Sequence, residues 1–142
     1  MALVRQKAYK MSPGFLNPFL IQDAVRRALD EDLGRAGDIT TQATIPASSI
    51  AHTVIAARET GVIAGLPLAE ATFHMIAQGV RFTPRLGDGT LVKKGDVIAE
   101  IEGSARAILS AERVALNFLG RLSGIASLTH RYVEHVRGTE AR

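Results

Sequence analysis

The sequence predicts an α+β fold, with a sheet-and-helix domain over residues 17–103 and a purely helical segment over residues 104–142. Between residues 49 and 102, short runs rich in Val, Ile and Ala are separated by glycine-containing turns, a pattern typical of strands. After residue 104 the apolar residues recur only at spacings of three and four, which indicates helix. Strands with one intervening helix, followed by further helix, are typical of α+β proteins. Residues 1–16 are expected to form a flexible arm.

The first helix has clear start and stop signals. Asn17 is a good N-cap, Pro18 suits the first turn, and Gly34 suits the C-cap. Asp30, Glu31 and Asp32 crowd the last turn, where the helix dipole disfavours negative charge. Two readings stay open for this acidic end, namely exposure to solvent at small cost or pairing with a basic partner. The residues expected to form the buried stripe are Ile21, Val25, Ala28, Leu29 and Leu33.

Four strands and a second helix are expected in the rest of the domain. Turns at residues 87–89 and 94–96 separate the later elements. In the last strand, Val97, Ala99 and Ile101 alternate with their neighbours, which indicates a half-exposed strand. The expected strands are residues 49–59, 61–65, 80–86 and 96–102, and the helix is residues 67–79.

The helical segment after residue 104 is apolar around most of its circumference, and Gly120 and Ser123-Gly124 predict a break into two helices. Arg113 is therefore expected to be embedded in apolar surface. Because an unpaired buried charge is costly, its guanidinium must meet an anion, either a protein carboxylate or a ligand. A narrow polar line shares one face of the helix. Its members are Arg106, Ser110, Arg113, Asn117 and Arg121.

Composition excludes several classes of function. The chain has 142 residues and no cysteine, so it has neither disulfides nor thiolate metal sites, which fits a cytoplasmic location. No apolar run approaches the roughly 18 residues of a membrane span. Residues 104–142 contain six arginines and three glutamates, which accounts for the whole net charge of +3. This modest charge and the scarcity of aromatic residues argue against nucleic-acid binding.

An ordered set of short motifs closely resembles the quinolinate phosphoribosyltransferases, also called nicotinate-nucleotide pyrophosphorylases. The resemblance covers residues 18 to 142, and although each motif is weak alone, the ordered set is specific. The motifs are, in order, Glu31-Asp32-Leu33-Gly34, Gly37-Asp38-Ile39-Thr40-Thr41, Ala57-Arg58-Glu59, Gly61-Val62-Ile63-Ala64-Gly65, Asp88-Gly89, Gly95-Asp96-Val97-Ile98-Ala99, the helical stretch 110–127, and within it Ser123-Gly124-Ile125-Ala126.

The resemblance implies an α/β-hammerhead-like N-terminal domain whose last helices lead into an α/β barrel that this chain lacks. It implies conversion of quinolinate and phosphoribosyl pyrophosphate to nicotinate mononucleotide, carbon dioxide and pyrophosphate, in NAD biosynthesis. It places Arg113 on a quinolinate carboxylate in the neighbouring subunit of a homodimer or higher oligomer, with Asn117 as a possible support. Mg²⁺ and the phosphates would be held by the barrel, so no catalytic or metal-binding residue is assigned here, and the fragment alone is expected to be inactive.

Two other functions stay open at this stage. Residues 88–102 resemble the hairpins of lipoyl and biotinyl carriers, but Lys93 and Lys94 precede a Gly-Asp turn and no modified-lysine tip is evident. A family homologue with a different substrate is the second alternative.

Overall fold

The computed structural model describes residues 16–139 and has the α+β architecture expected from the sequence. The expected arm over residues 1–16 lies, but for Leu16, outside the described residues. The helices are α1 (Pro18–Leu33), α2 (Ile39–Thr44), α3 (Leu66–Ile76) and α4 (Ala105–Val136). The strands are β1 (Ile50–Ala56), β2 (Gly61–Val62), β3 (Arg81–Pro84), β4 (Leu91–Val92) and β5 (Val97–Ser104).

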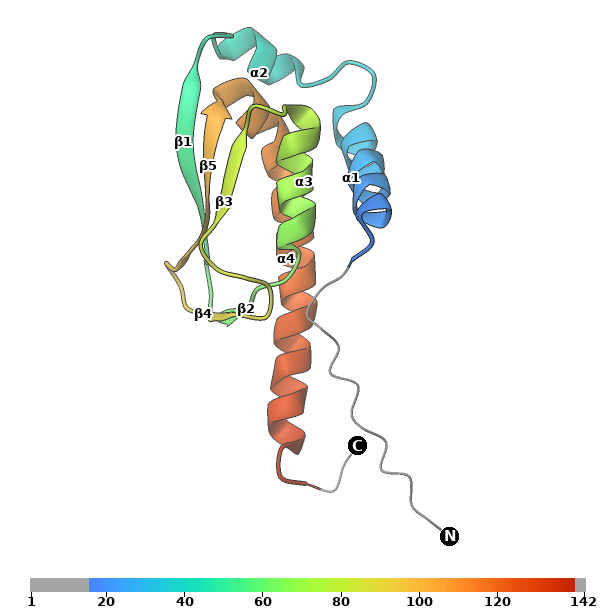
Figure 1. Ribbon diagram of the computed structural model, residues 1–142, viewed down its shortest axis with the longest axis vertical. Coiled ribbons are helices and arrows are strands. Elements are labelled where there is room, and N and C mark those ends of the chain that lie inside the picture. Colours follow the sequence, from blue (N-terminus) through green and yellow to red (C-terminus); the bar gives the residue numbers. More distant parts are fainter. Residues whose placement is uncertain (1–15, 140–142) are drawn as a thin grey trace.

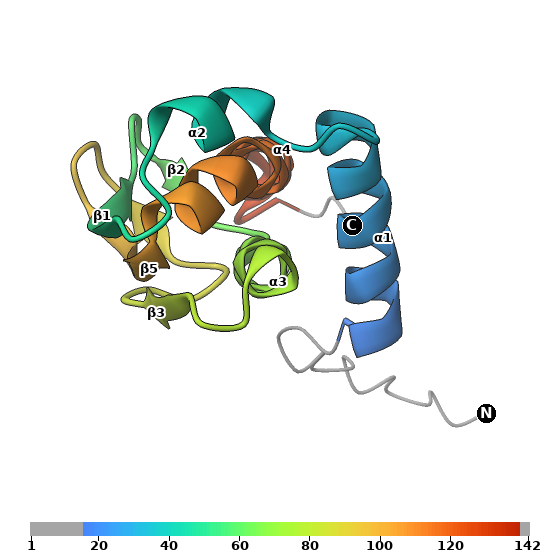
Figure 2. The same ribbon diagram turned by 90° about the horizontal axis from the view of Figure 1, so that it is seen from above.

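The strands form two antiparallel sheets. The larger has the order β1-β5-β3, so β5 is the central strand, and the smaller pairs β2 with β4. Helices α3 and α4 cover one face of the larger sheet, and α1 lies outside them as a third layer (Figures 1 and 2). Helix α2 lies beside the first turns of α4 (Figure 2).

Two apolar clusters hold these layers together. The larger fills the space between the sheet and helices α3 and α4, and includes the stacked rings of Phe73 and Phe82, whose centroids are 5.8 Å apart. The smaller joins α1 to α3 and α4 through Val25, Leu29 and Val114. Helices α3 and α4 both contribute to both clusters, so together they join α1 to the larger sheet.

Helix α1 follows the local signals in the sequence. The Asn17 side chain accepts a hydrogen bond from the backbone N of Phe19, and Gly34 closes the helix at φ +54°. Val25 and Leu29 are buried, and the remaining predicted stripe residues pack against them. The predicted helix is therefore confirmed at both ends.

Helix α3 is capped by a distant residue. Gly65 at its N-terminus adopts φ +104° and has no side chain to cap the helix. The Asp88 carboxylate fills that role by accepting hydrogen bonds from the backbone N of Gly65 at 2.9 Å and of Leu66 at 3.0 Å. The turn before β4 thereby fixes the start of α3.

The predicted break after Gly120 is wrong, because α4 is one continuous helix of 32 residues. A glycine inside a helix costs only about 0.5–1 kcal/mol relative to alanine, and the packing of Leu119 and Leu122 with the hydrogen bonds of Ser123 and Ser127 offsets that cost. An apolar circumference also led us to expect that little of this helix faces water, and that expectation is wrong. The last buried residue of α4 is Leu119, and the C-terminal part extends beyond the sheets (Figure 1). None of the helices between residues 16 and 139 is long and apolar enough to cross a membrane.

Candidate functional site

The residues of the polar line on α4 contact two different helices, α2 and α1. Arg106 donates from Nε to the carbonyl of Ile45 at 2.6 Å and from Nη2 to the carbonyl of Gln42 at 2.9 Å. Both carbonyls lie at the C-terminal end of α2. A guanidinium there satisfies acceptors that have no partner within the helix and complements the helix dipole.

The N-terminal end of α2 is held from the same face of α4. Asp38 caps α2 by accepting a hydrogen bond from the backbone N of Thr41 at 2.9 Å, and Ser110 donates to its other carboxylate oxygen at 2.9 Å. Hydrogen bonds from the Thr41 side chain and backbone, with a smaller contribution from Ser110, lower the pKa of Asp38 against the opposing effect of desolvation. Arg106 and Ser110 therefore hold α2 against α4.

Arg113 contacts the acidic end of α1. Its Nη1 lies 3.3 Å from Oδ1 of Asp32, a residue 81 positions earlier in the chain. The acidic end therefore has a basic partner, one of the two readings left open by the sequence. The expectation that Arg113 is embedded in apolar surface is wrong, because its side chain is 76% exposed. The buried stripe of α4 faces the sheet, α3 and α1, and Arg113 lies beside that stripe.

A groove of about 460 Å³ runs between α1 and α4 at this ion pair. Its apolar surface comes from Ala28, Val114 and Phe118, of which Val114 is buried. Charged and amide groups surround that surface. They are Glu31, Asp32, Arg113, Asn117 and Arg121. An apolar floor beside a guanidinium suits a flat, anionic ligand, since the fork of an arginine matches a carboxylate.

Arg113 and Asn117, the two site residues expected from the sequence, both line this groove but, within the described part of the chain, do not contact each other through a hydrogen bond. The residue that contacts Arg113 is Asp32. Arg121 lines the same groove and forms no ion pair with any residue between 16 and 139. The acidic cluster at the end of α1 was the sequence signal that pointed to Asp32.

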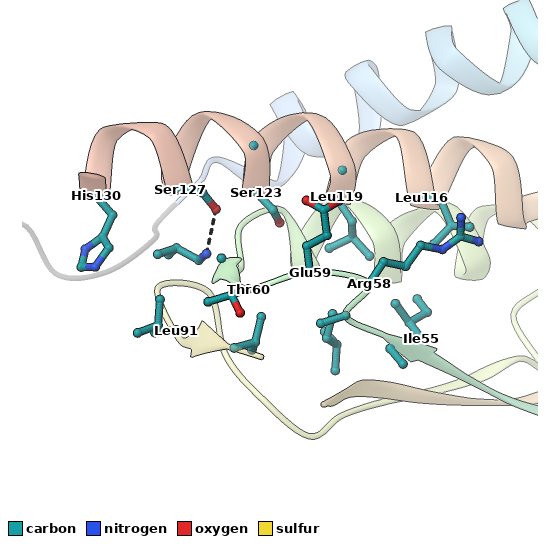
Figure 3. Close-up of a pocket in the computed structure, with 18 of the residues that line it drawn as sticks. Ile55, Arg58, Glu59, Thr60, Leu91, Leu116, Leu119, Ser123, Ser127 and His130 are labelled. Atoms are coloured by element: carbon teal, nitrogen blue, oxygen red, sulfur yellow. Dashed lines mark hydrogen bonds between the residues drawn. The ribbon is translucent and has the colours of Figure 1, made fainter. Parts of the chain in front are cut away.

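A second cavity, of about 770 Å³, lies between the middle of α4 and the small sheet. Figure 3 shows Ser123 and Ser127 projecting from α4 into it, with Arg58 and Glu59 on the loop after β1. Ser127 Oγ accepts a hydrogen bond from the backbone N of Val62 at 2.8 Å. Ser123 Oγ accepts from the backbone N of Ala64 at 3.0 Å and donates to its carbonyl at 3.2 Å. These serines attach β2 and its extension to α4, a role that the sequence did not suggest.

Comparison with known proteins decides the family. Residues 38–123 match the family described as "Quinolinate phosphoribosyl transferase, N-terminal domain", which is more than half of the chain. The chain belongs to the quinolinate phosphoribosyltransferase family. The "Nicotinate-nucleotide pyrophosphorylase [carboxylating]" of Mycobacterium leprae is 41% identical over 123 residues, which are 85% of this chain and 43% of that protein. The "Quinolinate phosphoribosyltransferase [decarboxylating] 1b" of Nicotiana tabacum is 39% identical over 109 residues, 77% of this chain and 31% of that protein.

Solved structures of the family have the same fold. NadC from Streptococcus pyogenes superposes with a TM-score of 0.82 at 41% identity, over 87% of this chain and 44% of that one. The nicotinate-nucleotide pyrophosphorylase from Francisella tularensis gives a TM-score of 0.81 at 28% identity over 87% of this chain and 44% of that one. The chain thus spans less than half the length of these quinolinate phosphoribosyltransferases and matches their N-terminal part.

This quinolinate phosphoribosyltransferase domain offers no metal centre within residues 16–139. No group of three or more His, Asp or Glu side chains there is placed to hold an ion. The resemblance implies that magnesium is held by the barrel, and the described residues form no site that fits it.

Proposed function

We propose that the chain is the N-terminal part of an enzyme that converts quinolinate and phosphoribosyl pyrophosphate to nicotinate mononucleotide, carbon dioxide and pyrophosphate. In this proposal Arg113 binds a quinolinate carboxylate in the active site of a neighbouring subunit. The names of the relatives support the reaction. The observation that carries the role of Arg113 is its position, since the guanidinium is exposed in a groove of mixed polar and apolar lining and makes one hydrogen bond among the described residues.

The shape of the groove supports an aromatic acid as the ligand. Ala28 and Phe118, which are partly exposed, offer apolar surface to a pyridine ring, and Arg113 lines the same groove. A guanidinium has five N–H donors, so a single bond to Asp32 leaves enough for a two-point contact with a carboxylate. The contact would orient the ring and stabilise negative charge that develops on it as carbon dioxide leaves.

The balance of charges in the groove supports an active site to which other parts of the protein also contribute residues. Arg113 and Arg121 are balanced by Glu31 and Asp32, so the groove has no excess of positive charge. Quinolinate is a dianion and phosphoribosyl pyrophosphate carries several more negative charges. Further cations must then come from outside this domain, which agrees with a shared active site and with inactivity of the isolated fragment.

Steady-state kinetics of the protein expressed from the complete coding region test the proposal. Arg113→Ala should lower kcat/KM for quinolinate by a factor of about 100 or more, the scale expected when a charged contact to substrate is lost. Arg81→Ala is the matched control, because Arg81 is an exposed arginine on β3 whose only ion pair among the described residues is with Glu102. Unchanged kinetics in the Arg113 variant would refute the assignment.

Substrate choice, assembly and location belong to the same proposal. Nicotinate has one carboxylate where quinolinate has two, so assays with each acid separate the proposed substrate from those of other family members. A homodimer is expected in light scattering of the complete protein, and the enzyme is expected in the cytoplasmic fraction of cells. A monomer with full activity would contradict the shared site.

A further inference from the structure

We propose that Asp32 is a positioning residue for Arg113, holding one edge of the guanidinium so that the rest can meet the carboxylate of the substrate. This inference rests on the proposed function, because it assumes that Arg113 binds substrate. The sequence resemblance assigns Asp32 no such role.

The two members of the pair are exposed to very different degrees. The Asp32 side chain is 21% exposed, whereas that of Arg113 is 76% exposed. The carboxylate is thus the more enclosed partner, held at the end of a helix that is packed through Val25 and Leu29. One hydrogen bond joins Nη1 of Arg113 to Oδ1 of Asp32. The remaining N–H groups of Arg113 contact no acceptor among residues 16–139.

Stability alone gives little reason for a carboxylate at this position. Asp32 lies in the last turn of α1, where the helix dipole disfavours an acid and where α1 has no basic residue of its own. An ion pair with a mostly exposed arginine adds little to folding stability. Asp30 lies in the same turn and has no ion pair within the described residues. The feature that distinguishes Asp32 from Asp30 is its contact with Arg113.

Holding Arg113 in place would favour binding. A free arginine side chain samples many rotamers, and a ligand that fixes it must offset the lost entropy. Because the Asp32 carboxylate already holds Nη1 of Arg113, part of this entropy is lost before the ligand binds, and the guanidinium is oriented toward the groove. Loss of Asp32 should therefore weaken quinolinate binding although Asp32 does not touch the substrate.

Kinetics of the protein from the complete coding region test this role through four variants. Asp32→Ala should raise KM for quinolinate about tenfold, equivalent to about 1.4 kcal/mol, with kcat and KM for phosphoribosyl pyrophosphate nearly unchanged. Asp32→Asn keeps an acceptor oxygen and should give an intermediate value. Asp30→Ala is the matched control, since it removes the same charge from the same turn outside the groove. In the Arg113→Ala background, Asp32→Ala should have no further effect on KM.

Each outcome decides one question. If Arg113→Ala changes nothing, the proposed function fails. If Arg113→Ala is damaging but Asp32→Ala and Asp30→Ala both match the unmodified protein, only the positioning role fails. A merely structural role predicts that the melting temperature falls together with affinity in Asp32→Ala, and that the two substitutions add in the double variant. The positioning role predicts an unchanged melting temperature and no additivity.

Discussion

Ser127 accepts a hydrogen bond from the backbone N of Val62 at 2.8 Å, although the two residues are 65 positions apart. One turn earlier on α4, Ser123 forms a pair of bonds with the backbone of Ala64. Residues four apart on a helix lie on one face, and these two serines satisfy main-chain groups on one side of β2 and the residues after it. Serine side chains of α4 thus supply hydrogen-bond partners that a neighbouring strand would otherwise supply.

Ser127→Ala should lower the free energy of unfolding by about 1–2 kcal/mol, because it leaves the N–H of Val62 without its acceptor. Ser123→Ala should have a similar cost. Urea denaturation gives the free energies, and hydrogen exchange should be faster at Val62 in the first variant and at Ala64 in the second. Thr129→Ala is the control, since the one side-chain hydrogen bond of Thr129 among the described residues is to the carbonyl of Ile125 in its own helix. Equal stability of all three variants would show that the serine contacts contribute nothing.

Two glycines of α4 should tolerate alanine. A Cβ at Gly120 or Gly124 would meet no atom within 4 Å, so each substitution should stabilise the chain by about 0.5–1 kcal/mol through helix propensity. Gly65→Ala should destabilise it, because Gly65 has φ +104° and an added Cβ would lie 2.9 Å from Cδ1 of Leu122. Thermal unfolding of the three variants separates these effects. Loss of stability in Gly124→Ala would contradict the open space seen there.

Asp38 should make the stability of the chain depend on acidity. Its pKa is lowered in the folded state by the hydrogen bonds from Thr41, with help from Ser110, so folding favours the ionised carboxylate. The resulting stabilisation is present above the pKa of an unfolded aspartate, near 3.9, and is lost as pH falls through the lower folded value. Asp38→Asn should keep a capping side chain but lose this contribution.

Denaturation of the unmodified chain and of Asp38→Asn between pH 2 and pH 7 provides the measurement. The difference in unfolding free energy between them should be greatest near neutral pH and shrink below about pH 4. A constant difference over this range would mean that Asp38 does not titrate differently in the two states.

Asp88 should contribute more to the free energy of unfolding than other aspartates in turns. Asp88→Ala leaves the N–H groups of Gly65 and Leu66 without their acceptor, at an expected cost of about 2–3 kcal/mol. Asp88→Asn keeps one acceptor oxygen and should lose about half as much. Asp96→Ala is the comparison, because Asp96 accepts from the N–H of Lys93 in an exposed turn. Equal costs for Asp88→Ala and Asp96→Ala would argue against the capping role.

The sequence predicts those parts of the fold whose determinants are local. Asn17, Pro18 and Gly34 mark the ends of α1 because capping depends on residues next to one another. Helix α2 was not expected although Asp38 caps it locally, since six residues are too few to show a helical period and its other contacts come from Arg106 and Ser110, some sixty to seventy positions later. Strand β4 was missed because two residues are too few to show alternation.

The candidate site was predictable in part. The acidic end of α1 indicated a basic partner, and the polar line on α4 contained Arg113. The burial of Arg113 was mispredicted because spacing along one helix does not show which sectors its neighbours cover. Ser123 stood in the predicted break and in a family motif, but neither Ser123 nor Ser127 indicated a contact with β2, because serine is as common on a solvated helix face as in a contact with a strand.

Because α4 is one unbroken helix, a small tilt partway along it displaces its C-terminal end by a larger distance. From Ser127, the last residue of α4 that bonds the small sheet, to Val136 the axis runs for about 14 Å. A tilt of about 5° at Ser127 would therefore move Val136 by roughly 1 Å. The packing around Ala111 and Ala115 sets the direction of α4 and therefore the position of any segment that follows it. A small change in core volume would displace that segment, although it lies far from the core.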